Sequence, residues 1–201
     1  MVAKIVTNED TNSISEAAYV LSRAGVVIAP TETCYALLCD ATNHNAVEKI
    51  FRIKGREASK SLSVFVSSPR MLDKYAVMNE SAKIVAKKNI PGPLTLVLKK
   101  RKPFKLAENL SGSDTIAIRI SSNLVIRKLL RSYPHPLTAT SANVSGEGEI
   151  YSAREAIRIF GHLVDLIIDA GNLPKEPPST VVDCSSGKPV VLREGKIKLV
   201  V

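Results

Sequence analysis

Four short polar clusters follow apolar runs in this sequence, and their residue types suit the binding of anions. The first, at 30–35, reads Pro-Thr-Glu-Thr-Cys-Tyr and supplies the hydroxyls of Thr31 and Thr33 directly after the apolar run 26–29. Binding sites on sheets commonly form where strands end. A turn that leaves a strand with capping hydroxyls explains the same residues, and for this cluster alone it is the favoured interpretation.

The second cluster carries three cations within seven residues: Lys54, Arg56 and Lys60. Placed around Gly55, they can surround an oligophosphate, because arginine offers forked hydrogen bonds and lysine a point charge. The helix dipole also favours cations at a helix C-terminus, by about 0.3–1 kcal/mol each. For this cluster alone the two interpretations are about equally supported.

The other two clusters are rich in hydroxyl and amide groups. Residues 140–146 offer Ser141, Asn143 and backbone N–H groups to phosphate oxygens or a metal-bound water, although an ordinary loop has the same composition. The fourth combines residues 178–180 with Arg193. In a neighbouring predicted strand, Arg119 alternates onto one face with Thr115 and Ala117, which favours a lined cavity over open solvent.

Several other site signatures are missing. There is no Gly-x-Gly-x-x-Gly, and the run 55–61 lacks the glycine before its lysine that a Walker loop requires. No His-Glu-x-x-His occurs, and the three histidines lie in unrelated contexts. The three cysteines, at 34, 39 and 184, lack zinc-finger spacing and are expected to be reduced thiols of a cytoplasmic protein.

Amphipathic helices and apolar strands that position these clusters alternate along the chain, without an internal repeat. Helices are predicted from capping boxes at 13–16 and 152–155, between Asn43 and Gly55, and after residues 69, 79 and 122. Strands are predicted at 25–29, 61–66, 94–98, 115–120, 137–140 and 164–170. The chain is expected to end in a meander of three strands, 180–184, 189–193 and 196–201.

These elements predict one domain, 1–201, of the α/β class (α+β type). A twisted, mixed and largely antiparallel sheet with flanking helices is expected to form a basic concave cavity. The 201 residues are 45% hydrophobic and 23% charged, typical of a globular chain. No apolar run approaches the roughly 18 residues of a membrane span, so no membrane partner is expected.

The net charge of +9, from 28 Lys plus Arg against 19 Asp plus Glu, indicates an anionic partner. That partner is either a polynucleotide or a small phosphorylated ligand. Aromatic residues make up only 4% of the chain, which argues against a base-stacking platform for single strands. A solvated basic face explains the charge equally well.

Taken together, seven motifs resemble those of the YrdC-type threonylcarbamoyl-adenylate synthases, in the same order and over about residues 13–195. They are Pro-Thr-Glu-Thr-x-Tyr (30–35), Lys-Gly-Arg (54–56), Pro-Gly-Pro-Leu-Thr (91–95), Thr-Ile-Ala-Ile-Arg (115–119), Thr-Ser-Ala-Asn-x-Ser-Gly (140–146), Ser-Thr-Val-Val-Asp (179–183) and Leu-Arg-x-Gly (192–195).

The resemblance implies a YrdC-like fold and a nucleotidyltransferase that makes threonylcarbamoyl-AMP and pyrophosphate from L-threonine, bicarbonate and ATP, with Mg²⁺. The product would pass to a partner complex that modifies the adenosine beside the anticodon of tRNA, with direct tRNA or double-stranded RNA contact left open. By motif position, the implied residues are the catalytic tetrad Lys54, Arg56, Ser141 and Asn143; ATP-facing Arg56, Lys60, Thr115, Ser141 and Arg193; and threonine-facing Thr33, Arg119, Ala139 and Ser179. No protein side chain is assigned to the metal.

The sequence departs from the family pattern at five places. Ala36 and Leu38 replace glycines, Ser61 replaces a proline, Phe65 replaces a histidine, and 147–149 reads Glu-Gly-Glu where the family is richer in Pro and Ser. Two alternatives to the synthase remain open. One is a non-catalytic double-stranded RNA or rRNA maturation factor that uses the same basic cavity, and the other is a carbamoyl-transfer module like that of hydrogenase-maturation enzymes.

Overall fold

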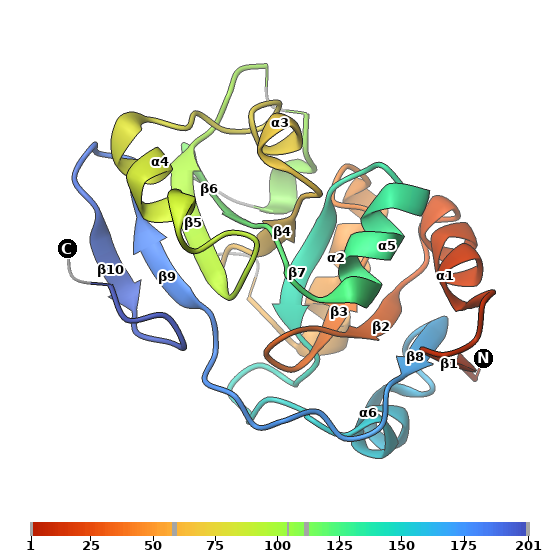
Figure 1. Ribbon diagram of the computed structural model, residues 1–201. Coiled ribbons are helices and arrows are strands. Elements are labelled where there is room, and N and C mark those ends of the chain that lie inside the picture. The colour runs from red at the N-terminus through yellow and green to blue at the C-terminus, as the bar shows by residue number, and fades with distance from the viewer. Residues whose placement is uncertain (1, 58–59, 104, 111–112, 200–201) are drawn as a thin grey trace.

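A single mixed sheet of ten strands dominates the computed structural model, which describes residues 2–57, 60–103, 105–110 and 113–199. The strand order is β1-β8-β2-β3-β7-β4-β6-β5-β9-β10 (Figure 1). Five of the nine neighbouring pairs are antiparallel and four are parallel, which confirms the mixed sheet expected from the sequence. The strands are β1 (Lys4–Thr7), β2 (Val27–Pro30), β3 (Tyr35–Leu38), β4 (Ser63–Phe65), β5 (Leu94–Lys99), β6 (Thr115–Arg119), β7 (Leu137–Ser141), β8 (Leu166–Asp169), β9 (Thr180–Asp183) and β10 (Val190–Arg193).

All the predicted helices form. Asparagine side chains at 43, 79 and 123, and Ser68, accept hydrogen bonds from the first turns of four of them. The two predicted capping boxes were wrong in detail: α1 begins at Ser13 with Asn12 before it, and neither Asn12 nor Ser152 makes a side-chain cap bond. The helices are α1 (Ser13–Ser22), α2 (His44–Lys54), α3 (Pro69–Leu72), α4 (Glu80–Lys87), α5 (Leu124–Ser132), α6 (Ala153–Phe160) and the 3-10 helix η1 (Glu108–Leu110).

Three predictions at the strand level need correction. Strands β1 and β3 were not predicted, because β1 is short and polar at its start and β3 follows the 30–35 cluster without an obvious break. The third strand of the C-terminal meander is not formed over residues 196–199, and residues 200–201 lie outside the described part of the chain.

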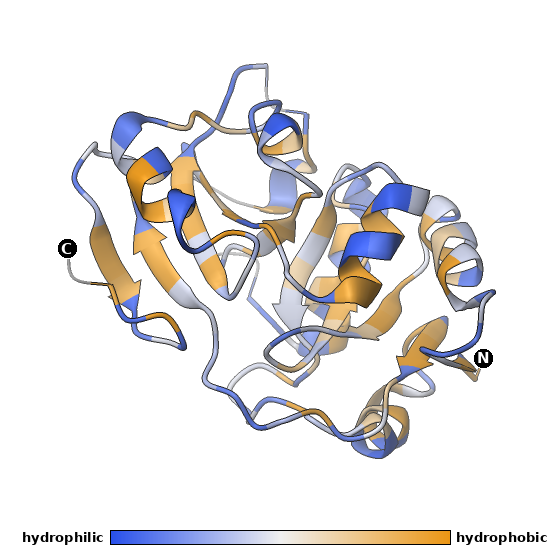
Figure 2. Cartoon of the chain, in the orientation of Figure 1, coloured by the Kyte–Doolittle hydropathy of each residue, from blue (hydrophilic) through white to orange (hydrophobic). Residues whose placement is uncertain are grey.

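Alternation along the strands gives the sheet two differently covered faces. One face carries Ile28 of β2 and Leu37 of β3 toward α2 and α6, in a core that continues under α3 and α4. The opposite face carries Ala29 and Leu38 toward α1 and α5, which lie side by side at the N-terminal half of the sheet (Figure 1). Figure 2 shows the same division, with the apolar side of α5 turned to the strands and its polar side outward.

Helices α1 and α5 do not extend over the C-terminal half of the sheet. Where that second face of β5, β6 and β7 is left open, its residues are polar or small: Thr95, Ala117, Arg119 and Ala139. The other face of the same strands carries Leu94, Leu96, Ile116 and Ile118, and these are buried in the core. A concave, hydrophilic surface is therefore left open between the two halves of the sheet.

The loop after β10 packs closely against residues 178–180 at Gly195. A Cβ at this position would lie 2.6 Å from the backbone of Ser179 and of Thr180, and still closer to the carbonyl oxygen of Pro178. Lys196 N donates to that same carbonyl at 2.9 Å, so the two segments cannot separate freely.

We therefore expect Gly195→Ala to lower the free energy of unfolding by about 1–3 kcal/mol through overpacking. Thermal unfolding measures this effect. Gly148→Ala is the matched control, because a Cβ there meets nothing within 4 Å. Equal melting temperatures for the two variants would show that the close approach of Gly195 to the backbone of residues 178–180 does not limit the side chain at position 195.

Candidate functional site

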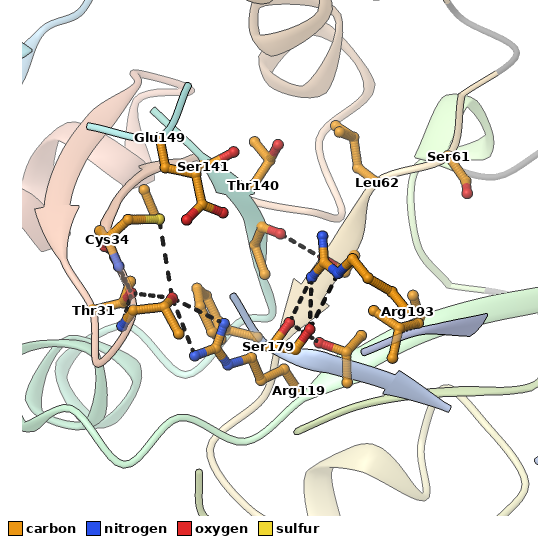
Figure 3. A pocket seen from close by; sticks show the side chains of 18 of the residues that line it. Thr31, Cys34, Ser61, Leu62, Arg119, Thr140, Ser141, Glu149, Ser179 and Arg193 are labelled. Carbon is orange, nitrogen blue, oxygen red and sulfur yellow. Dashed lines mark hydrogen bonds between the residues drawn. The ribbon is translucent and has the colours of Figure 1, made fainter. Parts of the chain in front are cut away.

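The open part of the second face forms a cavity of about 220 Å³. Its walls come from the loop between β2 and β3, from β4 to β7, from β9 and from the end of β10 (Figure 3). Arginines 56, 119 and 193 supply its positive charge, and threonine and serine hydroxyls supply most of its other polar atoms. The cavity therefore combines cations with hydrogen-bond donors, as anion sites require.

Arg119 lies at one end of the cavity and is only 7% exposed. Its guanidinium forms an ion pair with Glu32 at 2.9 Å and lies 3.4–3.5 Å from the hydroxyl of Thr33, over the ring of Phe65. Burial alone would raise the pKa of Glu32, but the charge of Arg119 and the hydroxyl of Ser121 lower it below its usual value. Glu32 therefore stays ionised and fixes the guanidinium in place.

One donor of Arg119 is not used by this arrangement. Its Nε is buried without a hydrogen-bond partner among the described residues. A buried N–H of a charged group costs free energy unless it is paired, and ligand oxygens commonly pair such groups at binding sites. Arg119 is thus oriented by the carboxylate of Glu32, and its Nε is left without a hydrogen-bond partner among the described residues.

Ser179 and Arg193 form the adjoining wall. Arg193 donates to the carbonyl oxygen of Ser179 at 2.9 and 3.2 Å and to its hydroxyl at 3.0 Å. The Ser179 hydroxyl also lies 3.0 Å from that of Thr95. Figure 3 shows these bonds holding Arg193 against the β9 end of the cavity. Its guanidinium is restrained by neutral oxygens, so its charge remains available to an anion.

Lys54 lies behind the cavity wall rather than in it. Its side chain is 1% exposed, and its ammonium donates to Ser141 O at 2.6 Å, Asn143 O at 2.8 Å and Asn143 Oδ1 at 3.0 Å. These three bonds use all three of its protons. Ser141 Oγ in turn donates to Asn143 Oδ1 at 2.6 Å. Lys54 therefore shapes the 141–143 loop that presents Ser141 to the cavity.

Arg56 comes two residues later, after Gly55 ends α2 in the left-handed conformation (φ +56°). Its Nε donates to Lys60 O at 3.0 Å and its Nη2 to Ser61 O at 3.0 Å, and these two bonds hold the guanidinium where it lines the cavity. The side chain of Lys60 is 56% exposed and does not line the cavity; it lies 3.9 Å from Glu57.

The cavity brings together seven of the eleven predicted site residues. Ala139 and Ser141 line it beside the three arginines, Thr33 and Ser179. Lys54, Lys60, Asn143 and Thr115 do not line it; Asn143 is bound to Lys54, and Thr115 begins β6 opposite Lys99. The roles assigned to all eleven stay predictions.

Sequence reasoning singled out neither Glu32 nor Glu149 as a site residue. Glu149 lines the cavity near Cys34, and its Oε2 accepts a hydrogen bond from the hydroxyl of Tyr151 at 3.0 Å. Burial and then the charge of Glu149 raise the pKa of the Cys34 thiol to about 12, so this cysteine is not poised as a nucleophile. Glu149 belongs to the 147–149 departure from the family pattern, which was the signal available for it.

The described residues also bear on three other expectations. All three cysteines are buried and unpaired thiols, as predicted. Within the described ranges, no group of three His, Cys, Asp or Glu could hold a metal ion, so a metal here would need ligands from a bound molecule. No helix in this part of the chain is both long and apolar enough to cross a membrane.

Comparison with known proteins gives relatives that cover nearly the whole chain. The threonylcarbamoyl-AMP synthase of Pyrococcus abyssi is 37% identical over 179 residues, which are 88% of this chain and 52% of that protein. The crystal structure of P. abyssi Sua5 complexed with L-threonine matches with a TM-score of 0.89 at 34% identity, over 97% of this chain and 58% of the other. The chain thus spans about half the length of these relatives.

A relative of similar length is also found. The crystal structure of Escherichia coli YciO has a TM-score of 0.83 and 30% identity, over 96% of this chain and 94% of the other. The profile of the Sua5/YciO/YrdC family, described as "Telomere recombination", matches residues 19–195. By its sequence, its sheet and its arginine-lined cavity, this chain belongs to the Sua5/YciO/YrdC family.

Proposed function

We propose that this chain is an L-threonylcarbamoyladenylate synthase. It joins L-threonine, bicarbonate and ATP into threonylcarbamoyl-AMP and releases pyrophosphate. The observation that carries the proposal is the Arg119 guanidinium, which lines the cavity and which Glu32 holds in a fixed orientation. An amino acid carboxylate is the group that suits such a donor. The P. abyssi relative complexed with L-threonine supports the choice of amino acid.

The two substrates occupy adjoining parts of the cavity in this proposal. Arg119 and Thr33 take the carboxylate of threonine, and Ser179 takes another of its polar groups. Arg56, Arg193 and Ser141 face the phosphates. Ala36, Phe65, Ala117, Ala139 and Val181 supply the apolar lining for the methyl group.

The reaction itself needs alignment and charge stabilisation more than a protein nucleophile. The amine of threonine first adds to the carbon of bicarbonate, and a C–O bond breaks to release water, which leaves the threonine carbamate. An oxygen of this carbamate attacks the α-phosphorus of ATP, and the bond from that phosphorus to the bridging oxygen of pyrophosphate breaks. Fixed arginines stabilise the charge that develops on the leaving pyrophosphate. No covalent enzyme intermediate is required, which agrees with the raised pKa of Cys34.

Mg²⁺ fits the oxygen donors of the cavity, Glu149 and Ser141, and when bound with ATP it would supply charge neutralisation of the phosphates. The product is an activated acyl adenylate. A transfer reaction that moves the threonylcarbamoyl group onto the adenosine beside the anticodon of tRNA would consume it.

Pyrophosphate release tests the proposal. We expect release only when ATP, Mg²⁺, bicarbonate and L-threonine are all present, and threonylcarbamoyl-AMP should appear by mass spectrometry. Threonine-independent release would contradict the proposal. The RNA-binding alternative instead predicts nucleic-acid affinity that falls steeply with salt.

L-serine should be a poorer substrate than L-threonine. It lacks the methyl group that the apolar lining would hold, and one methyl in such a pocket is worth about 1–3 kcal/mol, or roughly 10- to 200-fold in kcat/KM. Competition of the two amino acids in the same assay measures the ratio. Equal kcat/KM values would show that the lining does not select for the methyl group.

A further inference from the structure

Glu149 is an unexpected residue in a cavity that binds a polyanion. Among the described lining residues it is the single carboxylate, beside three arginines. On charge alone, a carboxylate at this place repels a triphosphate. Its presence therefore calls for a partner cation that binds together with the phosphates.

The carboxylate of Glu149 is oriented but not neutralised. The hydroxyl of Tyr151 donates to Oε2 at 3.0 Å. Among the described residues no Lys or Arg lies within ion-pair distance of Glu149, although its charge acts on the buried ammonium of Lys54, and no hydrogen bond to Oε1 is formed. Figure 3 places the side chain beside Ser141 at the cavity wall.

We propose that Glu149 is the carboxylate ligand of the divalent cation that enters with the nucleotide triphosphate. The inference rests on the function proposed above. Mg²⁺ keeps oxygen ligands and is commonly held by one or two carboxylates together with substrate phosphates. One carboxylate with a free oxygen meets this requirement, so the site needs no cluster of three acidic or histidine residues.

The inference predicts a coupling between the metal and one side chain. With the cation, Glu149 attracts the nucleotide; without it, Glu149 repels the nucleotide. Binding of α,β-methylene-ATP, whose α–β bridge cannot be cleaved, is measured by calorimetry in Mg²⁺ and in EDTA. The wild-type protein should bind the analogue more tightly in Mg²⁺.

Glu149→Gln should reduce that Mg²⁺ preference by tenfold or more, with binding in EDTA unchanged or tighter. The apparent affinity of Mn²⁺ for the protein–analogue complex, read by electron paramagnetic resonance, should fall by a similar factor. Glu147→Gln is the matched control, because Glu147 is exposed two residues away and does not line the cavity. It should keep the wild-type preference.

Two results would overturn the inference while leaving the synthase proposal standing. One is a Glu149→Gln variant that keeps the wild-type ratio of its affinities for α,β-methylene-ATP in Mg²⁺ and in EDTA. The other is a Glu149→Gln variant that is changed only in its affinity for threonine. Absence of any nucleotide binding by the wild-type protein would instead overturn the proposed function and this inference together. Unchanged melting temperatures of both variants verify that each is folded.

Discussion

Replacing Lys54 with methionine abolishes pyrophosphate release while leaving the protein folded: this is the result that we expect. The methionine fills the space of the lysine stem but leaves Ser141 O, Asn143 O and Asn143 Oδ1 without their shared donor. A buried acceptor that loses its partner costs about 1–3 kcal/mol. The 141–143 loop should therefore relax, and Ser141 should leave its position on the cavity wall.

Arg52→Met is the matched control for this substitution. Arg52 lies on the same helix, α2, with its side chain 70% exposed and a single ion pair to Glu48 at 3.4 Å. It should keep the wild-type rate of pyrophosphate release. A Lys54→Met variant as active as Arg52→Met would show that the three hydrogen bonds do not position the site.

The pH dependence of the site should follow from the same lysine. Burial, and next the charge of Arg56, lower the pKa of Lys54 to about 8. The unfolded chain holds this proton up to its ordinary pKa of 10.5, so the lysine's contribution to global stability rises with pH between about 8 and 10.5. Activity should nevertheless fall above pH 8, because neutral Lys54 has one donor fewer for the 141–143 loop.

This divergence can be measured directly. Side-chain NMR of Lys54 gives the midpoint of its titration. Pyrophosphate release gives the fall of activity above pH 8, and chemical unfolding gives the free energy of unfolding over the same pH range. A Lys54 midpoint above 10, or a loss of global stability that accompanies the loss of activity, would contradict the assignment.

The sequence predicted the elements of this fold better than the contacts between them. Hydrophobic spacing located all the helices because periodicity reports which face is buried. Strand β3 escaped notice because it follows the 30–35 cluster without an obvious break. Burial along its whole length does not explain the miss, since β2 is equally buried and was predicted. The third strand of the meander was predicted but is not formed. Residues 196–199 alternate between polar and apolar side chains as a strand does, but they pair with no strand in the described chain.

The sequence motifs predicted which residues gather at the site, but only partly what each of them does there. Lys54 and Arg56 stand two residues apart and look equivalent in sequence, yet one is sequestered behind the wall and the other lines it. Gly55 makes this difference, because its left-handed conformation turns the chain between them. Glu32 is similar: its pairing with Arg119 spans 87 positions, and no local pattern encodes it.

Removing Arg119 should have the second large effect, on both stability and activity. Arg119→Leu leaves the buried carboxylate of Glu32 without its cation, and breaking such a pair from one side costs about 3–5 kcal/mol. The charge-assisted bond that we propose to the threonine carboxylate would be worth roughly 1.5–3 kcal/mol, so kcat/KM for threonine should fall by about 10- to 150-fold or more. Urea unfolding and pyrophosphate release measure the two losses separately.

The ion pair also fixes the sign of a pH effect. In the wild-type protein Arg119 holds the pKa of Glu32 below its usual value. Ionised Glu32 therefore contributes to folding stability at pH values above the usual pKa of glutamate, and this contribution is lost as the pH falls through the lowered pKa. In Arg119→Leu, burial acts without the compensating charge, and the pKa of Glu32 should rise above its usual value. The stability gap between the two proteins should therefore be large at pH 7.5 and small near pH 4.

The double variant Glu32→Gln/Arg119→Leu separates the ion pair from simple loss of packing. The glutamine keeps the shape of Glu32 and its contact with Ser121 but carries no charge, so the double variant should be more stable at pH 7.5 than Arg119→Leu alone. It should keep the reduced kcat/KM for threonine of Arg119→Leu, because the guanidinium is still missing. An equal stability loss at both pH values, or a double variant no more stable than the single one, would show that Glu32 is not the source of the cost.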